Sequence, residues 1–154
     1  MKSREHLIVG MDELVPLFKE QLAVGKSVRF SPKGISMLPM LREGKDTVTL
    51  SAPPDRLKKY DIPLYRRDDG KYVLHRVVSV DGNYTCIGDN QFVYEPNIRP
   101  DQIIALVTAF SRGEKEHRTN EPVYRIYCRF WHHSRVLRHF WRRGIGKLKR
   151  IFHI

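Results

Sequence analysis

Apolar positions near the N-terminus recur at the spacing of an α-helix. They are Leu14, Val15, Phe18 and Leu22, separated by one, three and four residues. Residues at these intervals share one helix face, and acidic residues at the start with a glycine after the end are helix boundary signals. The pattern predicts an amphipathic helix over Met11–Ala23, with Pro16 tolerated near its first turn.

Beyond this helix the apolar residues form short runs that end in turn residues, as strands joined by tight turns do. The predicted strands cover residues 27–30, 47–50, 62–66, 72–80, 84–87 and 103–110. Asp81-Gly82-Asn83 lies between two of these runs and predicts a hairpin. Strands at such short intervals predict a mainly β, α+β fold, built as an antiparallel, barrel-like domain with a short N-terminal helix.

The length and composition fit one folded domain. A chain of 154 residues buries about 68–70% of the surface that its unfolded form exposes. The content of 41% apolar and 29% charged residues is typical of globular proteins. We expect a β domain over residues 1–111 with its core over 26–111, a polar linker over 112–121 and a basic tail over 122–154.

Cysteine usage gives no sign of a metal or a disulfide framework. Only Cys86 and Cys128 are present, which is too few for either kind of site. We interpret them as reduced thiols that pack as small apolar side chains. No metal and no organic cofactor is expected.

Positive charge is concentrated at the C-terminal end. The formal net charge is +11, and residues from Arg112 onward hold twelve Lys/Arg and three Glu, a balance of +9. Residues 1–111 are therefore nearly neutral. This distribution argues against a nucleic-acid-binding surface on the β domain.

The tail over 122–154 is also amphipathic. It contains nine Lys/Arg, no Asp or Glu and seven of the sixteen aromatic residues. One predicted helix face holds Tyr127, Phe130, Leu137, Trp141, Ile145, Leu148 and Phe152. The other side holds Arg125, Arg129, Arg135, Arg142, Arg143, Lys147 and Arg150. Such a helix either lies in the surface of an anionic membrane or docks its apolar face on the β domain, and the sequence leaves both open. A tail that binds nucleic acid is a third, less favoured alternative.

The N-terminal region lacks targeting signals. The first thirty residues contain no apolar run of the ~20 residues that cross a bilayer, and no signal-peptide pattern. We expect a cytoplasmic protein, placed at the inner membrane face if the tail binds lipid.

The candidate chemistry begins in a loop between two predicted strands. The segment Gly34-Ile35-Ser36-Met37-Leu38-Pro39 places a serine where a rigid sheet could hold it. Gly34 lets backbone amides approach a substrate, and Pro39 stiffens the exit of the loop. A serine in such a loop is more often a turn residue, so Ser36 alone indicates no function.

A histidine and two carboxylates follow at a workable spacing. In Leu74-His75-Arg76, His75 interrupts an aliphatic strand, and a histidine within hydrogen-bond reach could take the proton of a serine hydroxyl. Asp89 and Glu95 come after a later strand, and either acid could orient the histidine and stabilise its cationic form. Judged alone, His75 is more simply a surface strand residue and Asp89 a turn residue.

Taken together, the three motifs resemble a known family. Ser-Met-x-Pro, then His-Arg-Val about forty residues later, then Gly-Asp-Asn with an acid six residues beyond the Asp, is similar to the endoplasmic-reticulum and archaeal branch of type I signal peptidases. This branch belongs to the superfamily of serine peptidases that includes LexA-type repressors. The resemblance covers residues 28–110.

The resemblance implies a β-rich catalytic fold and a serine endopeptidase. Ser36 would be the nucleophile and His75 the base, in place of the lysine of bacterial signal peptidases and LexA-type repressors. Glu95 stands at the family position of the third acid, where an Asp is usual, so the orienting role stays open between Glu95 and Asp89, with Glu95 slightly favoured. The substrate would be a peptide or protein precursor, cut near small side chains.

Three departures from the family bear on this interpretation. Signal peptidases commonly carry a serine two residues before the nucleophile to help bind the oxyanion, and this chain has Gly34. Only the backbone N–H groups of Ser36 and Ile35 would then serve, with Gly34, Met37 and Pro39 beside the substrate. The absence of an N-terminal membrane anchor or DNA-binding domain leads us to expect neither general secretory processing nor a LexA-type repressor.

Two alternatives use the same fold. The first is a non-catalytic module that binds peptides in the groove beside Ser36. The second is a LexA-like regulatory protein that cuts itself, for which Ala23-Val24-Gly25 is similar to a small-residue cleavage site. The combined presence of serine, histidine and acid favours the enzyme, because a binding module needs none of them for chemistry. The sequence does not indicate an oligomeric state.

Overall fold

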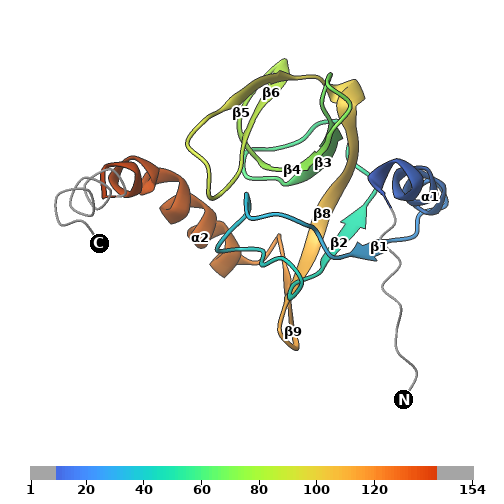
Figure 1. Cartoon of the computed structure of the whole chain (residues 1–154), viewed down its shortest axis with the longest axis horizontal. Helices are drawn as coiled ribbons and strands as arrows, with labels where there is room; N and C mark the ends of the chain where they lie inside the picture. Colours follow the sequence, from blue (N-terminus) through green and yellow to red (C-terminus); the bar gives the residue numbers. More distant parts are fainter. Residues whose placement is uncertain (1–9, 142–154) are drawn as a thin grey trace, which may run out of the picture.

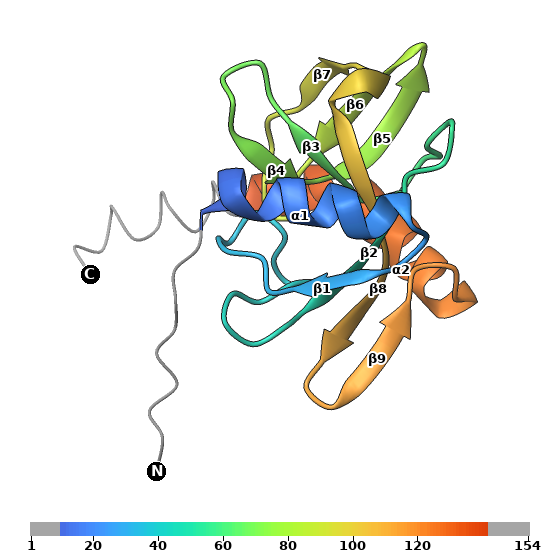
Figure 2. The same ribbon diagram turned by 90° about the vertical axis from the view of Figure 1, so that its right-hand side faces the viewer.

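The computed structural model describes residues 10–141, and it begins with the predicted N-terminal helix. Helix α1 (Met11–Ala23) buries Val15, Phe18 and Leu22, which share one face in the sequence pattern. The ring of Phe18 lies 5.5 Å from that of Phe30 in strand β1 (Val28–Phe30). The apolar face of α1 therefore covers the core of the sheet that contains β1 (Figure 2).

The larger of two sheets has six antiparallel strands. Its order is β1-β2-β8-β3-β4, and β9 pairs with β8 outside this path. The bounds are β2 (Val48–Ser51), β3 (Pro63–Arg66), β4 (Tyr72–Leu74), β8 (Ile103–Arg112) and β9 (Lys115–Arg118). Strand β8 is ten residues long and pairs with β2, β3 and β9, so it forms the centre of the sheet (Figure 1).

The smaller sheet contains β5 (Arg76–Asp81), β6 (Asn83–Ile87) and β7 (Glu95–Ile98), paired in that order. Gly82 has a φ of 67° and forms the predicted hairpin turn between β5 and β6. A short 3-10 helix, η1 (Pro100–Gln102), follows β7 and leads into β8. His75 is the single residue between β4 and β5, so the chain passes from one sheet to the other at this histidine.

Two clusters of buried side chains form the core. One combines α1 and the larger sheet with apolar residues that follow Ser36 and with Tyr124 and Cys128 from the C-terminal helix. The second joins the two sheets, through Tyr65 of β3 and Val77, Tyr84, Cys86 and Ile98 of the smaller sheet. Burial raises the pKa of the Cys86 thiol to about 12, so this cysteine packs as a neutral apolar group.

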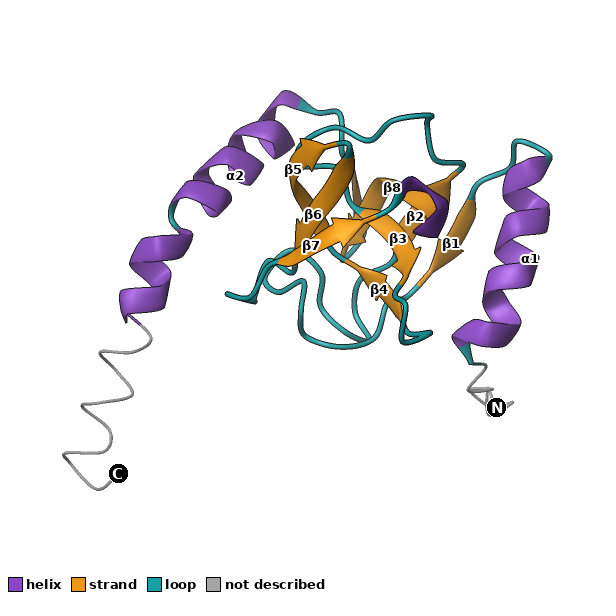
Figure 3. Ribbon diagram, turned by 90° about the horizontal axis from the view of Figure 1, so that it is seen from above, coloured by secondary structure: helices purple, strands orange, loops and turns teal. Residues whose placement is uncertain are grey.

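The C-terminal helix α2 (Pro122–His133) lies on the opposite side of the sheets from α1 (Figure 3). After a turn at Ser134, residues 135–141 are again helical. Tyr124, Cys128 and Arg135 are buried against the β domain. No helix within residues 10–141 has the length and apolarity that crossing a membrane requires.

The docked face of α2 differs from the predicted apolar face. Phe130, Leu137 and Trp141 are 69–70% exposed, whereas Arg135, expected on the polar side, is 4% exposed. Arg125 and Arg129 are exposed as expected. The remaining predicted tail positions lie outside the described residues: Arg142, Arg143, Ile145, Lys147, Leu148, Arg150 and Phe152.

The prediction of an α+β fold dominated by antiparallel strands is confirmed. A closed barrel is not found among residues 10–141, because β5, β6 and β7 pair only with one another. The strand predicted over 72–80 is divided at His75. Strands β7 and β9 are additions to the prediction, and β9 occupies residues for which a linker is expected.

Candidate active site

Ser36 lies in the long loop between β1 and β2 and is partly exposed. The residues that follow it are buried: Met37 is 4% exposed, and Met40 and Leu41 are each 2% exposed. Asp46 closes the loop, because its buried carboxylate accepts hydrogen bonds from the backbone and guanidinium of Arg42 at 2.8–2.9 Å. Apolar burial and this ion pair therefore hold the chain on the C-terminal side of Ser36.

A second loop, Gly88–Gln91, holds the Ser36 loop from the other side. The backbone N–H of Asn90 donates to the carbonyl of Ser36 at 2.8 Å, and the Asn90 amide donates to the carbonyl of Ile35 at 3.1 Å. A Cβ atom at position 88 would lie 2.6 Å from the Ser36 carbonyl oxygen. The two loops approach so closely because residue 88 is glycine.

The backbone N–H groups of Ile35 and Ser36 donate no hydrogen bond to any protein atom that the structure describes. They follow Gly34, which has a φ of 93°, a conformation that favours glycine. Adjacent unpaired N–H groups in a loop form a pocket for a negatively charged oxygen. These two N–H groups are therefore the candidate donors to an oxyanion formed at Ser36.

His75 is held at the junction of the two sheets and is 2% exposed. Its Nδ1 lies 3.0 Å from Oε1 of Glu95. The hydroxyl of Tyr65 lies 3.3 Å from the same nitrogen and donates to Oε2 of Glu95 at 2.8 Å. Since a carboxylate only accepts hydrogen bonds, the ring proton belongs on Nδ1, and Nε2 is the free acceptor of the neutral ring.

Glu95 is itself fixed by a cation. Nε of Arg67 donates to Oε2 at 2.9 Å, and the terminal nitrogen of Arg67 pairs with Oε1. Burial opposes ionisation of the carboxyl, but the hydrogen bonds from Arg67 and Tyr65 outweigh it and lower the pKa of Glu95. Glu95 is therefore a carboxylate at neutral pH.

The environment keeps His75 neutral in the resting state. Burial lowers the pKa of His75 below its ordinary value of 6.5, although the carboxylate of Glu95 acts in the opposite direction. A neutral imidazole with an unprotonated Nε2 can accept a proton at pH 7. Once protonated, the ring would be stabilised by the adjacent Glu95.

Ser36 and His75 line one open pocket of about 220 Å3, together with Gly34, Met37 and Gln91. Within the described part of the chain, the Ser36 hydroxyl forms no hydrogen bond with His75. In serine hydrolases this bond often tightens only when substrate binds. Pro39 lies outside the pocket, exposed, and its carbonyl accepts from Arg112 at 3.1 Å.

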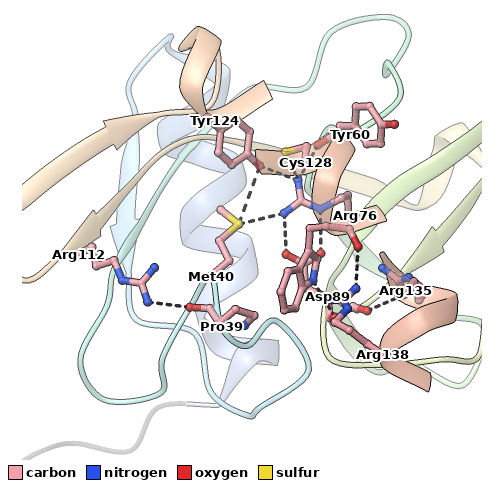
Figure 4. A network of polar contacts seen from close by, with 12 residues as sticks. Pro39, Met40, Tyr60, Arg76, Asp89, Arg112, Tyr124, Cys128, Arg135 and Arg138 are labelled. Carbon is pink, nitrogen blue, oxygen red and sulfur yellow. Dashed lines mark hydrogen bonds and ion pairs between the residues drawn. The ribbon is translucent and has the colours of Figure 1, made fainter. Parts of the chain in front are cut away.

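Asp89 is engaged elsewhere, in an ion pair with Arg76. The guanidinium donates to both carboxylate oxygens, at 2.8 and 2.7 Å, and the two side chains are 0% and 1% exposed. Arg76 also donates to Tyr124 Oη and Cys128 Sγ of α2 (Figure 4). Of the two acids considered from sequence, the structure places Glu95 on His75 and Asp89 in the attachment of α2.

Helix α2 also contacts the Gly88–Gln91 loop directly. The indole N–H of Trp131 donates to the carbonyl of Asp89 at 3.0 Å. Arg135 donates to the carbonyls of Gly88 and Gln91 at 3.2 and 2.8 Å. The loop that supports Ser36 is therefore enclosed between the serine loop and α2.

Sequence reasoning did not single out Asn90, Tyr65 and Arg67, which position Ser36 and Glu95. Asn90 is the last residue of the Gly-Asp-Asn motif, so the motif could have indicated its role. Tyr65 and Arg67 are two residues apart on and just after β3, a spacing that puts both on one side of a strand. A partly buried carboxylate such as Glu95 favours a cation nearby, but nothing in the sequence says which of many arginines provides it.

The comparisons with known proteins do not extend this description. No protein-family model matches the chain, and no curated protein matches it. Within residues 10–141 no cluster of His, Cys, Asp and Glu side chains is arranged to hold a metal ion.

Proposed function

We propose that the chain is a serine endopeptidase that cleaves a peptide or protein precursor through an acyl-enzyme. The observation that carries the proposal is a chain of contacts in which Arg67 holds Glu95 and Glu95 holds Nδ1 of His75. This chain leaves Nε2 of His75 unprotonated, and His75 and Ser36 line the same pocket. Serine peptidases of the triad type combine a nucleophile, a base and an acid that orients the base.

In the proposed reaction, the Ser36 hydroxyl attacks the scissile carbonyl carbon and transfers its proton to Nε2 of His75. The carbonyl oxygen becomes an oxyanion, which the N–H groups of Ile35 and Ser36 stabilise. His75 then gives the proton to the leaving amine as the C–N bond breaks. Water then attacks the ester carbonyl on Ser36 while His75 takes its proton. His75 returns this proton to Oγ of Ser36 as the acyl C–O bond breaks, which releases the product acid and restores the resting site.

The finer assignment of the fold belongs to the same proposal. The motifs around Ser36, His75 and Gly88-Asp89-Asn90 support a relationship to the signal-peptidase and LexA-type peptidases. The described groups favour the histidine-assisted branch, because Glu95 holds Nδ1 of His75 as the third acid would.

Covalent labelling with a fluorophosphonate probe tests the nucleophile. We expect labelling of the wild type and none of Ser36→Ala, with His75→Ala at least about 10³-fold slower. Ser31→Ala is the matched control, since Ser31 is an exposed serine in the same loop. A wild type that neither reacts with the probe nor cleaves peptides, yet binds them, would indicate the non-catalytic module instead.

A further inference from the structure

Helix α2 keeps a row of exposed apolar side chains after it has docked on the β domain. Val123, Ile126 and Phe130 are 76%, 68% and 69% exposed. Their spacing of three and four residues places them on one helix face. The docked face, which contains Tyr124 and Cys128, is a different one, so docking leaves this row in solvent.

Further apolar side chains are exposed beyond the turn at Ser134. In the helical residues 135–141, four large apolar side chains are 65–70% exposed. They are Val136, Leu137, Phe140 and Trp141. Seven large apolar side chains are thus exposed between residues 123 and 141, and apolar exposure gathered in one segment marks an interaction surface.

Cations lie next to the row. Arg125 and Arg129 are exposed and four residues apart on α2, between the apolar row and the docked face. The whole segment 122–154 contains nine Lys/Arg and no Asp or Glu. The partner that fits must therefore combine an apolar layer with negative charge at its surface.

We infer that α2 and the helical residues 135–141 bind the surface of an anionic lipid bilayer while the opposite face of α2 stays docked on the β domain. The exposed apolar row enters the boundary between headgroups and acyl chains, and Arg125 and Arg129 reach the headgroup phosphates. Trp141 and Phe140 suit this depth, where aromatic rings are enriched. One face of α2 thus docks on the β domain while another face binds the membrane at the same time.

A lipid surface fits the charge better than a second copy of the chain does. Two copies that meet through α2 would bring together two segments that carry only positive charge, and like charges at an interface oppose association. An anionic bilayer supplies the countercharge and accepts a row of apolar side chains without a complementary groove.

Sedimentation of the full-length protein with sucrose-loaded vesicles tests this inference. We expect binding to phosphatidylcholine vesicles that contain phosphatidylglycerol, weaker binding to phosphatidylcholine alone, and a decrease with added salt. Val123→Ser/Ile126→Ser/Phe130→Ser should lower the partition coefficient more than about tenfold. The matched control is Leu17→Ser/Val24→Ser, which removes exposed apolar side chains from α1 and the residue after it.

A second pair of variants tests the charges. Arg125→Gln/Arg129→Gln should lower partition into the anionic vesicles about fivefold for each cation removed. Lys19→Gln/Lys26→Gln removes two exposed cations in and after α1 and should leave binding unchanged. Circular dichroism checks that each variant remains folded, as expected for substitutions at exposed positions.

The inference fails if the intact protein does not sediment with anionic vesicles, or if the serine variant and its α1 control bind equally. It also fails if the α2 variants weaken binding to a single-stranded oligonucleotide but not to vesicles, since the surface would then be a nucleic-acid site. A dimer in sedimentation velocity that the serine variant dissolves would assign the row to a second copy instead. None of these outcomes depends on peptidase activity.

Discussion

The ion pair between Arg76 and Asp89 should carry a large share of the stability of the fold. Asp89→Asn keeps the shape of the side chain but removes its charge, leaving the guanidinium of Arg76 buried at 1% exposure. Its remaining partners are all uncharged in their resting states: Tyr60 O, Tyr124 Oη, Cys128 Sγ and Met40 Sδ. Burial disfavours the cation, and the carboxylate of Asp89 more than offsets this to raise the pKa of Arg76.

Breaking such a pair by removing one partner costs about 3–5 kcal/mol. Domains of this kind are stable by about 5–15 kcal/mol, so the loss is about a fifth of the total or more. The corresponding decrease in Tm is about 6–20 °C for a chain of this length. Arg76→Met/Asp89→Leu removes both charges and should recover most of the loss, because the desolvation of both ions is removed as well.

Urea denaturation measures the free energy of unfolding of each variant, with the fluorescence of Trp131 and Trp141 and circular dichroism as the signals. Thermal denaturation measures the decrease in Tm. The coupling between positions 76 and 89 is the free energy of unfolding lost by Arg76→Met/Asp89→Leu minus the summed losses of the single variants Arg76→Met and Asp89→Leu. A loss below about 1 kcal/mol for Asp89→Asn, or additive losses in the double variant, would refute the reasoning.

The remaining predictions concern the pocket. Since burial lowers the pKa of His75 below 6.5, the acid limb of the pH profile of kcat/KM should lie below that pH. Glu95→Gln removes a negative charge that favours protonated His75, so the acid limb should move to lower pH. A shift to higher pH would contradict the contact between Glu95 and His75. Gly88→Ala places a Cβ against the Ser36 carbonyl and should slow fluorophosphonate labelling at least about tenfold. A shift of about 1 Å in a reacting group can cost about 10²-fold in rate. An unchanged labelling rate would show that the two loops adapt and that this close approach does not position Ser36. Gly34→Ser must adopt a φ of 93° and should lower the free energy of unfolding by about 1–2 kcal/mol in urea denaturation, with no loss if the loop rearranges.

The sequence predicted those parts of the fold that depend on local periodicity. Helix α1 has the predicted bounds because Val15, Phe18 and Leu22 face one sheet. Strand β7 escaped prediction because Pro96 and Asn97 interrupt any apolar alternation. Strand β9 consists of charged residues and histidine, and it forms because β8 offers it an unpaired edge.

In the candidate site, too, local motifs were predictable and long-range contacts were not. Ser36, His75 and Glu95 could be proposed from motif spacing, and the choice between Glu95 and Asp89 depended on which arginine each acid meets. The docked face was not predictable from hydrophobicity, because Arg135, which follows α2, is buried while one of its guanidinium nitrogens donates to backbone carbonyls. Hydrophobic spacing selected Phe130 and Leu137, which the structure leaves exposed.

The hydrogen bonds from Trp131 of α2 and from Arg135, which follows α2, end on the carbonyls of Gly88, Asp89 and Gln91 in the loop beside the serine. Every amino acid supplies a carbonyl, so this attachment does not depend on which side chain stands at position 91. Gln91 also lines the pocket. A library randomised at this position should therefore yield folded variants that differ in the peptides they accept, which makes residue 91 a practical starting point for re-engineering selectivity.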